Sequence, residues 1–213
     1  KWGLFEVSCS GKSDGNPFRD YEMTVTFKGD KEEVKVTGFY DGDGVYKARF
    51  MPSYEGAYTY EIRGNFADEI TEPKGSFEAV APSKDNHGPV TVSEGIRLAY
   101  KDGTPYYSIG TTCYAWANQP VKRQEQTLET LKNSPFNKIR FCFFPKFYEF
   151  NTKEPLTYPF ERGHGEGLDP KLVELEKTNR FAFPGMRLEE PDYDFDYTRP
   201  NVEHFKRYDL RIA

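Results

Sequence analysis

The clearest structural signal in this 213-residue chain is the stretch GFYDGDGVYKARFMPSYEGAYTYEI, Gly38–Ile62. Apolar and polar residues alternate from Val45 to Met51 and again from Ala57 to Ile62. A period of two residues is typical of β-strands that bury one face. The turn sequence DGDG precedes the first run and SYEG separates the two runs, so the stretch predicts antiparallel strands joined by tight turns.

The same pattern extends toward the amino terminus. Met23, Val25 and Phe27 alternate with polar residues, and the turn sequence KGDKEE follows them. Several short strands at hairpin spacing, with no helical pattern between them, are typical of an immunoglobulin-like β-sandwich. We therefore predict an all-β sandwich over residues 1–81, with most of its aromatic side chains pointing inward.

The composition excludes several classes of function. Aromatic residues make up 16% of the chain, charged residues 30%, and the formal net charge is -5. This balance gives no electrostatic attraction for nucleic acid or anionic lipid, and no apolar run approaches the roughly 18 residues that span a bilayer. The three scattered cysteines, Cys9, Cys113 and Cys142, fit neither a disulfide framework nor a zinc site. We expect free thiols and a cytoplasmic protein, with secretion as the alternative, and neither a nucleic-acid nor a membrane partner.

A change in composition follows the predicted sandwich. The segment VAPSKDNHGPV, Val80–Val90, is rich in Pro, Ser, Asp, Asn and Gly, which predicts a linker at residues 82–90. After it, Ile96–Tyr100 and Pro105–Ile109 flank the turn sequence KDGT. These two runs predict a second hairpin.

The pattern then changes to that of an α/β protein. Tyr106–Trp116 is a run of apolar and small residues, Gln124–Lys132 contains helix formers with Leu128 facing inward, and Phe136–Pro145 is a second apolar run. Strand, helix and strand at this spacing predict a βαβ unit and the beginning of a parallel sheet. A parallel sheet needs cover on both faces and neighbouring strands on both edges, and two strands provide neither. We therefore interpret the sequence as part of a larger α/β protein.

The last part of the chain is predicted to be a long loop and a helix. The stretch from Lys146 to about Thr198 is rich in Pro, Gly, Tyr and acidic residues, which predicts irregular structure. The sequence NVEHFKRYDLRIA, Asn201–Ala213, has helical spacing, and Pro200 is expected in its first turn. The predicted buried stripe of this helix consists of Val202, Phe205, Tyr208 and Ile212.

Taken together, the two regions resemble the N-terminal part of a family of glycoside hydrolases. In that family a DUF5060-type sandwich precedes a DUF4038/DUF5605-type (β/α)8 barrel of the cellulase-like clan. The resemblance lies in four segments, Asn16–Phe27, Gly38–Ile62, Leu98–Trp116 and Phe136–Asn151. It implies a multidomain fold in which residues 1–81 form the sandwich and residues 91–213 form the first βα units of an incomplete TIM barrel.

The resemblance also implies a function. The parent protein is expected to be a retaining, endoglucanase-like hydrolase of a β-linked poly- or oligosaccharide that needs no cofactor. In the clan the two catalytic carboxylates lie at the ends of the fourth and seventh strands, and neither is within this sequence. The 213-residue chain alone is therefore expected to be inactive, and a second chain that carries the rest of the barrel is an expected partner. The alternative is a non-catalytic carbohydrate-binding or structural β-sandwich module.

Candidate substrate-binding residues follow from the barrel interpretation, because binding residues of such barrels lie at the C-terminal ends of strands. These positions are Tyr114 and Trp116 for the first strand, and Arg140, Phe144 and Lys146 for the second. An aromatic ring can stack on a sugar, while a cationic side chain can bind hydroxyl groups or orient a carboxylate. Two alternatives stay open, because Arg140 could pair with a buried acid and Trp116 could belong to the core.

Other motifs are interpreted as structural. The sequence DGDG, Asp41–Gly44, lacks the later ligands of a calcium loop and is expected to be a hairpin turn. His87, His164 and His204 have no ligand partners at metal-binding spacing, so we expect no metal site. The acidic run EEPDYDFDY, Glu189–Tyr197, is expected to be a solvated loop, or a loop over a substrate cleft, rather than a catalytic pair.

Overall fold

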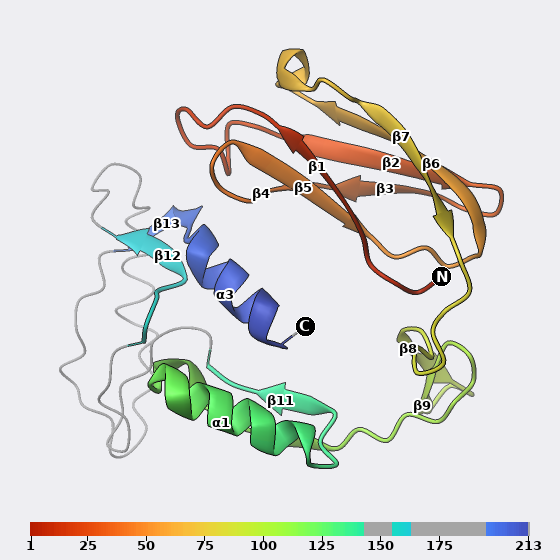
Figure 1. The fold of residues 1–213 in the computed structure, drawn as a ribbon, viewed down its shortest axis with the longest axis vertical. Coiled ribbons are helices and arrows are strands. Elements are labelled where there is room, and N and C mark those ends of the chain that lie inside the picture. Colours follow the sequence, from red (N-terminus) through yellow and green to blue (C-terminus); the bar gives the residue numbers. More distant parts are fainter. Residues whose placement is uncertain (143–154, 163–194, 213) are drawn as a thin grey trace. The chain divides into compact units, whose positions relative to one another are not determined.

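The computed structural model describes residues 1–142, 155–162 and 195–212 of the chain (Figure 1). These residues fall into two compact units, Lys1–Tyr107 and Ser108–Ala213. We call the first the sandwich unit and the second the βαβ unit, and we describe each by itself. In the residues that the structure describes, no helix is long and apolar enough to cross a membrane.

Seven strands build the sandwich, and all their pairings are antiparallel. The strands are β1 (Phe5–Ser10), β2 (Met23–Gly29), β3 (Glu33–Thr37), β4 (Phe39–Tyr40), β5 (Val45–Phe50), β6 (Gly56–Gly64) and β7 (Lys74–Ala79). One sheet has the order β1-β5-β4 and the other the order β3-β2-β6-β7, and a short 3-10 helix, Ala67–Glu69, precedes β7. The β-sandwich predicted from the alternating pattern is confirmed.

The sandwich core consists of residues that alternate along the strands. Met23, Val25 and Phe27 of β2 are buried, whereas the intervening threonines are half-buried. The ring of Phe27 stacks on that of Phe50, with their centroids 4.5 Å apart. The other buried hydrophobic members are Val7, Tyr46, Ala48, Tyr58, Ile62, Phe66 and Ala79. Because each large apolar side chain contributes about 1.5–3 kcal/mol on burial, this core is the main source of stability in the unit.

The DGDG sequence forms the tight turn between β4 and β5. The backbone N–H of Asp41 donates a hydrogen bond to the carbonyl of Val45 at 2.8 Å. Gly42, Asp43 and Gly44 all adopt positive φ, at 88°, 52° and 71°. At Gly44 a Cβ atom would lie 2.9 Å from a backbone carbonyl oxygen, so glycine is required there. The interpretation as a hairpin turn is confirmed.

A small antiparallel hairpin follows the sandwich. Its strands are β8 (Val90–Ser93) and β9 (Arg97–Tyr100), and Ala99 forms a further isolated bridge with Pro105. The predicted turn at KDGT is confirmed by the hydrogen bond from Tyr100 N to the Thr104 carbonyl at 2.8 Å. The predicted second arm, Pro105–Ile109, is wrong beyond Tyr106, because no ladder continues after the bridge. Strand β8 was not predicted, since VTVS is short and directly follows a proline.

The segment before β8 is held in place by contacts that we call the clasp, made by Trp2, Asn86, His87, Gly88 and Asp102. The amide of Asn86 donates to the Trp2 carbonyl at 2.9 Å, and His87 Nδ1 lies 2.7 Å from Asp102 Oδ2. Gly88 has φ 80°, and a Cβ atom there would lie 2.7 Å from the indole of Trp2. The segment 82–90, which was predicted to be a linker from its composition, therefore forms an ordered connection within the sandwich unit.

The βαβ unit begins with two parallel strands joined through a helix. These are β10 (Gly110–Thr112), α1 (Val121–Lys132) and β11 (Lys138–Arg140), with a 3-10 turn, Trp116–Asn118, between β10 and α1. The ladder continues past the strand ends, because Cys113 N donates to the Arg140 carbonyl at 2.8 Å and Cys142 N to the Tyr114 carbonyl at 2.9 Å. The predicted strand–helix–strand unit is confirmed.

Part of the predicted loop is instead a strand pair. Strands β12 (Phe160–Arg162) and β13 (Phe195–Pro200) pair antiparallel, so the expectation of irregular structure from Lys146 to Thr198 is wrong for these residues. The sequence pattern missed β12 because it has only three residues, and it missed β13 because its alternating Asp and aromatic residues were interpreted as a loop. The remaining residues of that stretch lie outside the described ranges, apart from the connecting residues 155–159.

Helix α3 (Val202–Ile212) confirms the predicted final helix. Its first turn and its buried side differ from the prediction. Pro200 ends β13, and Asn201 caps the helix by accepting hydrogen bonds from the N–H groups of Glu203 and His204 at 3.1 and 3.4 Å. His204 and Tyr208, one turn apart, are buried, whereas Phe205 is exposed. The predicted stripe is therefore wrong at Phe205. The Ile212 side chain lies outside the described residues.

Candidate functional site

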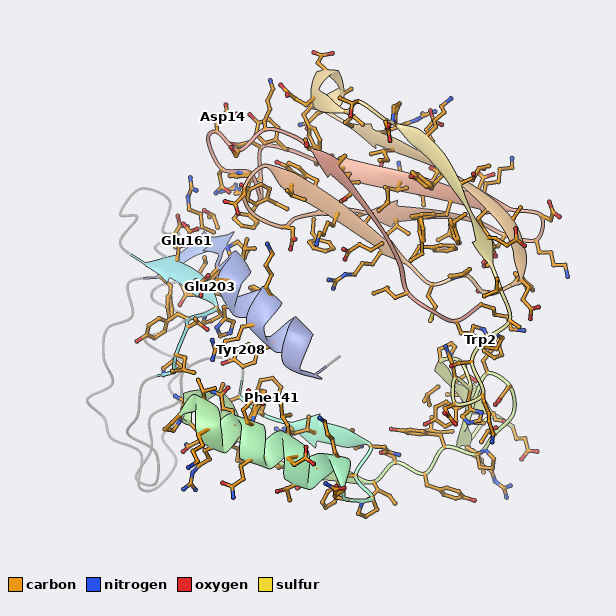
Figure 2. All side chains as sticks on the ribbon, viewed as in Figure 1. Trp2, Asp14, Phe141, Glu161, Glu203 and Tyr208 are labelled. Carbon is orange, nitrogen blue, oxygen red and sulfur yellow. The ribbon has the colours of Figure 1, made fainter. Side chains whose placement is uncertain are left out.

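In the described part of the chain, the two parallel strands have one face covered by packed side chains and one face with exposed side chains. Cys113 and Phe141 pack with Leu128 of α1 against the buried residues Trp116 and Tyr208. Figure 2 shows Phe141 and Tyr208 directed toward each other, with ring centroids 5.9 Å apart. Because side chains alternate along a strand, the neighbouring residues point to the opposite face. We call that face the open face. It carries Thr112, Tyr114, Lys138 and Arg140, which are all exposed.

The structure brings two of the candidate residues together on the open face. The guanidinium of Arg140 lies over the ring of Tyr114, with the Cζ atom 5.5 Å from the ring centroid. Both residues come from the C-terminal ends of their strands, and Tyr114 is 44% exposed. The pair offers an aromatic ring beside a fixed fork of up to five N–H donors. It can therefore contact both the apolar face and the hydroxyl groups of a polar ring compound.

The structure places Trp116 apart from this pair. The 3-10 turn after β10 carries the indole into the core, where it packs against Phe141 and Tyr208 with centroid distances of 5.3 and 5.6 Å. Its Nε1–H donates to the carbonyl of Gln124 at 3.2 Å. This position matches the alternative that the sequence left open, a role in the core. The last two candidates, Phe144 and Lys146, lie outside the described residues.

A buried glutamine was missed by sequence reasoning. Gln124 in the first turn of α1 has no exposed surface, and its Nε2 donates to the carbonyls of Ala117 and Gln119 at 3.2 and 2.8 Å. It thereby fixes the turn that follows β10 against the helix. A polar residue in a helical pattern is normally expected in solvent, so the pattern contained no signal for this role.

His204 is the second buried polar residue that the sequence did not assign. Its Nδ1 lies 2.9 Å from the hydroxyl of Thr157, and its ring packs edge-on against Tyr208 with a centroid distance of 4.7 Å. Burial lowers the pKa of His204 to about 4, and the positive charge of Arg207 adds to this effect. His204 is therefore a neutral core residue at physiological pH.

The acidic run differs from its expected form where the structure describes it. Phe195 to Tyr197 belong to β13, and Asp196 is buried, so the expectation of a solvated loop is wrong for these three residues. One oxygen of Asp196 accepts hydrogen bonds from the N–H and hydroxyl of Thr198 at 2.9 and 2.7 Å, and the other lies 3.5 Å from Arg199 Nε. These contacts assign Asp196 a structural role. Residues 189–194 lie outside the described ranges.

Neither a metal cluster nor a disulfide is found in the parts of the chain that the structure describes. No three His, Cys, Asp or Glu side chains come together there as metal ligands. His87 is paired with Asp102, and His164 lies outside the described residues. Cys9, Cys113 and Cys142 are free and half-buried, and burial raises the pKa of the Cys9 thiol. The expectation of free thiols is confirmed.

The outer face of the four-stranded sheet is polar rather than aromatic. A shallow hollow of about 590 Å³ lies on it, lined by Thr26, Lys28, Glu33, Thr59, Tyr60, Glu61, Lys74, Gly75 and Ser76. Two exposed ion pairs cross this face, Lys28–Glu33 at 3.3 Å and Lys74–Glu61 at 3.8 Å. Most aromatic residues of the sandwich instead join or pack against its core, as predicted. This arrangement disfavours a sugar platform of stacked aromatic rings on that face.

Comparisons with known proteins agree with part of this description. Residues 1–65 match the family model of DUF5060, a domain of unknown function. A crystal structure of a "putative glycoside hydrolase" from Bacteroides vulgatus ATCC 8482 matches 99% of this chain, with 34% sequence identity and a TM-score of 0.79. The chain covers 37% of that protein, which is less than two-fifths of its length. None of the curated proteins matches. The DUF5060 part of the predicted resemblance is confirmed, and the barrel part stays a prediction.

Proposed function

We propose that this chain supplies the immunoglobulin-like domain and the first strands of a (β/α)8 barrel in a glycoside hydrolase. The proposed enzyme acts on β-linked poly- or oligosaccharides in an endoglucanase-like manner. Two findings support the proposal. The chain is similar over 99% of its length to the Bacteroides vulgatus protein, and its strands β10 and β11 are parallel with α1 between them. A larger barrel would supply further neighbours for these two strands, which form a two-stranded sheet in the described residues.

The observation that carries the proposal is the Arg140–Tyr114 pair on the open face. Helix α1 and the buried tryptophan pack on the other face of the same strands. In a (β/α)8 barrel the helices lie outside and the uncovered face lines the interior, while ligands bind at the C-terminal rim. Because both residues of the pair lie at this end of their strands, a completed barrel would place them beside the substrate.

The proposed roles follow from the side-chain chemistry. Tyr114 would stack on the apolar face of a sugar ring. Arg140 would donate hydrogen bonds to sugar hydroxyl groups or to the nucleophilic carboxylate, and its charge would keep that carboxylate ionised. Strands β10 and β11 contain no acidic residue, so both carboxylates of the retaining mechanism would come from the remaining polypeptide.

Hydrolysis by a completed protein tests the proposal. Residues 1–213 are joined to the part of the Bacteroides vulgatus protein that they do not match, and aryl β-glycosides and soluble β-glucans are offered as substrates. We expect Arg140→Lys, which keeps the charge but loses the planar fork, to lower kcat/KM by about 10–100-fold. Lys138→Ala is the matched control, because Lys138 lies on the same strand and face but at its N-terminal end.

Three results would count against the proposal. They are a folded completed protein that hydrolyses none of these substrates, an Arg140→Lys variant with unchanged kcat/KM, and a Lys138→Ala variant that loses as much activity as Arg140→Lys. Saturable glucan binding by a completed protein that never hydrolyses would favour the non-catalytic module instead.

A further inference from the structure

Strand β13 bulges out of its ladder with β12. Phe160 pairs with Pro200, but the next residue of β12, Glu161, pairs with Asp196. The register therefore shifts, and the residues between Asp196 and Pro200 lie outside the ladder. We call this segment the β13 bulge, and it consists of Tyr197, Thr198 and Arg199. Because bulges re-aim side chains and are over-represented beside active sites, this segment is a candidate for contact with a ligand.

The buried carboxylate of Asp196 holds the bulge in shape. Asp196 is 1% exposed, and one of its oxygens accepts hydrogen bonds from the N–H and hydroxyl of Thr198 at 2.9 and 2.7 Å. The other oxygen lies 3.5 Å from Arg199 Nε and accepts no hydrogen bond from the residues that the structure describes. A buried carboxylate needs a positive charge beside it, so Asp196 keeps the guanidinium in place. The side chain of Arg199 is nevertheless 28% exposed.

The bulge also carries an aromatic ring in a fixed position. Tyr197 is half-buried, and its ring packs edge-on against Phe160 and Phe195 with centroid distances of 5.2 and 6.1 Å. The bulge thus combines a ring with a guanidinium, as the Arg140–Tyr114 pair does on the open face. An aromatic ring can contact the apolar face of a sugar unit, and a guanidinium can donate hydrogen bonds to its hydroxyl groups.

The bulge lies in the connection between β11 and α3. Figure 1 shows β12 and β13 at the N-terminal end of α3, where Asn201 N donates to the Pro159 carbonyl at 2.9 Å. Further along α3, Tyr208 packs against Phe141, which directly follows β11. In a (β/α)8 barrel, the connection from a strand to the next helix lies at the C-terminal rim, where ligands bind. The proposed barrel would therefore have the bulge and the Arg140–Tyr114 pair on the same rim.

We propose that the β13 bulge is a second sugar-binding subsite of the proposed hydrolase, and that the substrate is a chain of several neutral sugar units. The inference rests on the proposed function, which supplies the ligand class and the rim. Arg199 donates hydrogen bonds to a sugar unit beyond the one at the Arg140–Tyr114 pair, and Tyr197 contacts the apolar face of that unit. Asp196 is a positioning residue, and because it neutralises Arg199, the subsite fits a neutral sugar. Binding energy at this remote unit favours long substrates over short ones.

Glycan binding by the 213-residue chain tests the subsite without catalysis. Cellohexaose, xylohexaose and mannohexaose are titrated into the chain by isothermal calorimetry. We expect saturable binding of at least one of them, with a dissociation constant that Arg199→Ala raises at least about 10-fold. Asp196→Asn keeps an acceptor for Thr198 but loses the charge beside Arg199, so it should also weaken binding. Arg123→Ala, at an exposed position of α1, is the control and should leave binding unchanged. Binding of none of the three, or equal dissociation constants with and without Arg199→Ala, would overturn the proposal.

The completed protein supplies a second measurement. There Arg199→Ala should lower kcat/KM at least about 10-fold for the hexasaccharide that binds best, but less than about 2-fold for an aryl β-glycoside with a single sugar unit. An equal loss for both substrates would indicate a structural defect and overturn the subsite. Hexasaccharide binding that depends on Arg199, together with a completed protein that hydrolyses nothing, would contradict only the proposed function. Hydrolysis that does not depend on Arg199 would contradict only the subsite.

Discussion

The sandwich unit and the βαβ unit differ in how many hydrophobic residues form the buried cluster of their described residues. In the sandwich, two sheets enclose eleven buried hydrophobic residues, including Phe27 and Tyr46. In the described residues of the βαβ unit, the buried hydrophobic cluster contains only Trp116, Ala117 and Tyr208. The sandwich is thus closed by its own residues on the inner faces of both sheets. Among the residues that the structure describes, packed hydrophobic side chains cover the parallel strands on one face.

Because of this difference, the residues that stabilise the protein and the candidate binding residues lie in different units. Most aromatic residues of the sandwich pack in or against its core. The outer face of its four-stranded sheet carries exposed ion pairs, which contribute little to the free energy of unfolding. In the described residues of the βαβ unit, the exposed side chains of Tyr114 and Arg140 lie together on the open face. Substitutions in the two units are therefore expected to have different consequences. The two tryptophans make them separable, because Trp2 reports on the sandwich unit and Trp116 on the βαβ unit.

The largest expected effect is that of Phe27→Ala. Phe27 is fully buried between Phe50 and Phe5, so its removal leaves a cavity in the closed core. We expect the free energy of unfolding of the sandwich unit to fall by about 3–5 kcal/mol, as measured by urea unfolding with Trp2 fluorescence. Phe39→Ala on the surface is the control and should cost less than about 1 kcal/mol. A loss below 1 kcal/mol for Phe27→Ala would contradict the description of a closed core.

The next effect is a loss of stability of the βαβ unit as the pH falls from about 6.5 to about 4. Its source is His204, whose pKa is lowered to about 4 by burial, whereas an unfolded histidine has a pKa of about 6.5. Between these values the unfolded state binds a proton that the folded state does not, so stability falls as the pH falls through this window. The loss from His204 amounts to at most about 3 kcal/mol.

Urea unfolding at pH 7, 6, 5 and 4, followed through Trp116 in a Trp2→Phe background, measures this loss. His204→Gln should lower stability at pH 7 but flatten the dependence on pH between 6.5 and 4. An unchanged slope in that variant would show that other groups cause the acid sensitivity.

A smaller effect is expected at Gln124, which fixes the turn before α1. Gln124→Leu leaves the carbonyls of Ala117 and Gln119 without its two hydrogen bonds, at a cost of about 1–3 kcal/mol to the βαβ unit. Because Trp116 donates to the backbone of residue 124, its emission should also shift to the red. Gln126→Leu on the exposed side of α1 is the matched control. Equal unfolding free energies for the two variants would refute the role of Gln124.

The smallest effect is expected on the outer face of the three-stranded sheet. The hydrogen bond from Arg49 and the neighbouring Lys47 hold the pKa of Glu6 below its ordinary value. The stability from this carboxylate is present above the ordinary pKa of about 4.3 and is lost as the pH falls through the lowered pKa. Because the pair is partly exposed, Glu6→Gln should cost less than about 1 kcal/mol at pH 7 and nothing at pH 2. A pH-independent cost, measured through Trp2, would exclude the electrostatic origin.

Sequence reasoning succeeded where one face of an element is simply apolar. The period of two along Met23, Val25 and Phe27 gave the sandwich strands, and the change of period after Tyr106 gave the parallel pair and α1. It failed for β8 and β12, which are too short for periodicity, and for β13, whose alternating Asp and aromatic residues were interpreted as a loop. Strand pairing across such distances depends on tertiary contacts that no local pattern contains.

The candidate site was also only partly predictable, because local sequence patterns do not contain tertiary contacts. Tyr114 and Arg140 could be placed from the sequence, because their positions at strand ends bring them to one edge. The buried positions of Trp116, Gln124 and His204 could not, since each depends on a turn or a neighbouring segment that folds over it. A polar residue is recognisable as buried only when its hydrogen-bond partners are known.

The clasp has a consequence for how this protein can be divided and recombined. A cut at the end of β7 would separate Trp2 from Asn86 and His87 and leave its indole without the backbone of Gly88 that packs against it. The compact unit that contains all of these contacts runs from Lys1 to Tyr107. Exchange of the sandwich unit between this chain and similar proteins should therefore tolerate a crossover point just after Tyr107 better than one within the polar segment that resembles a linker.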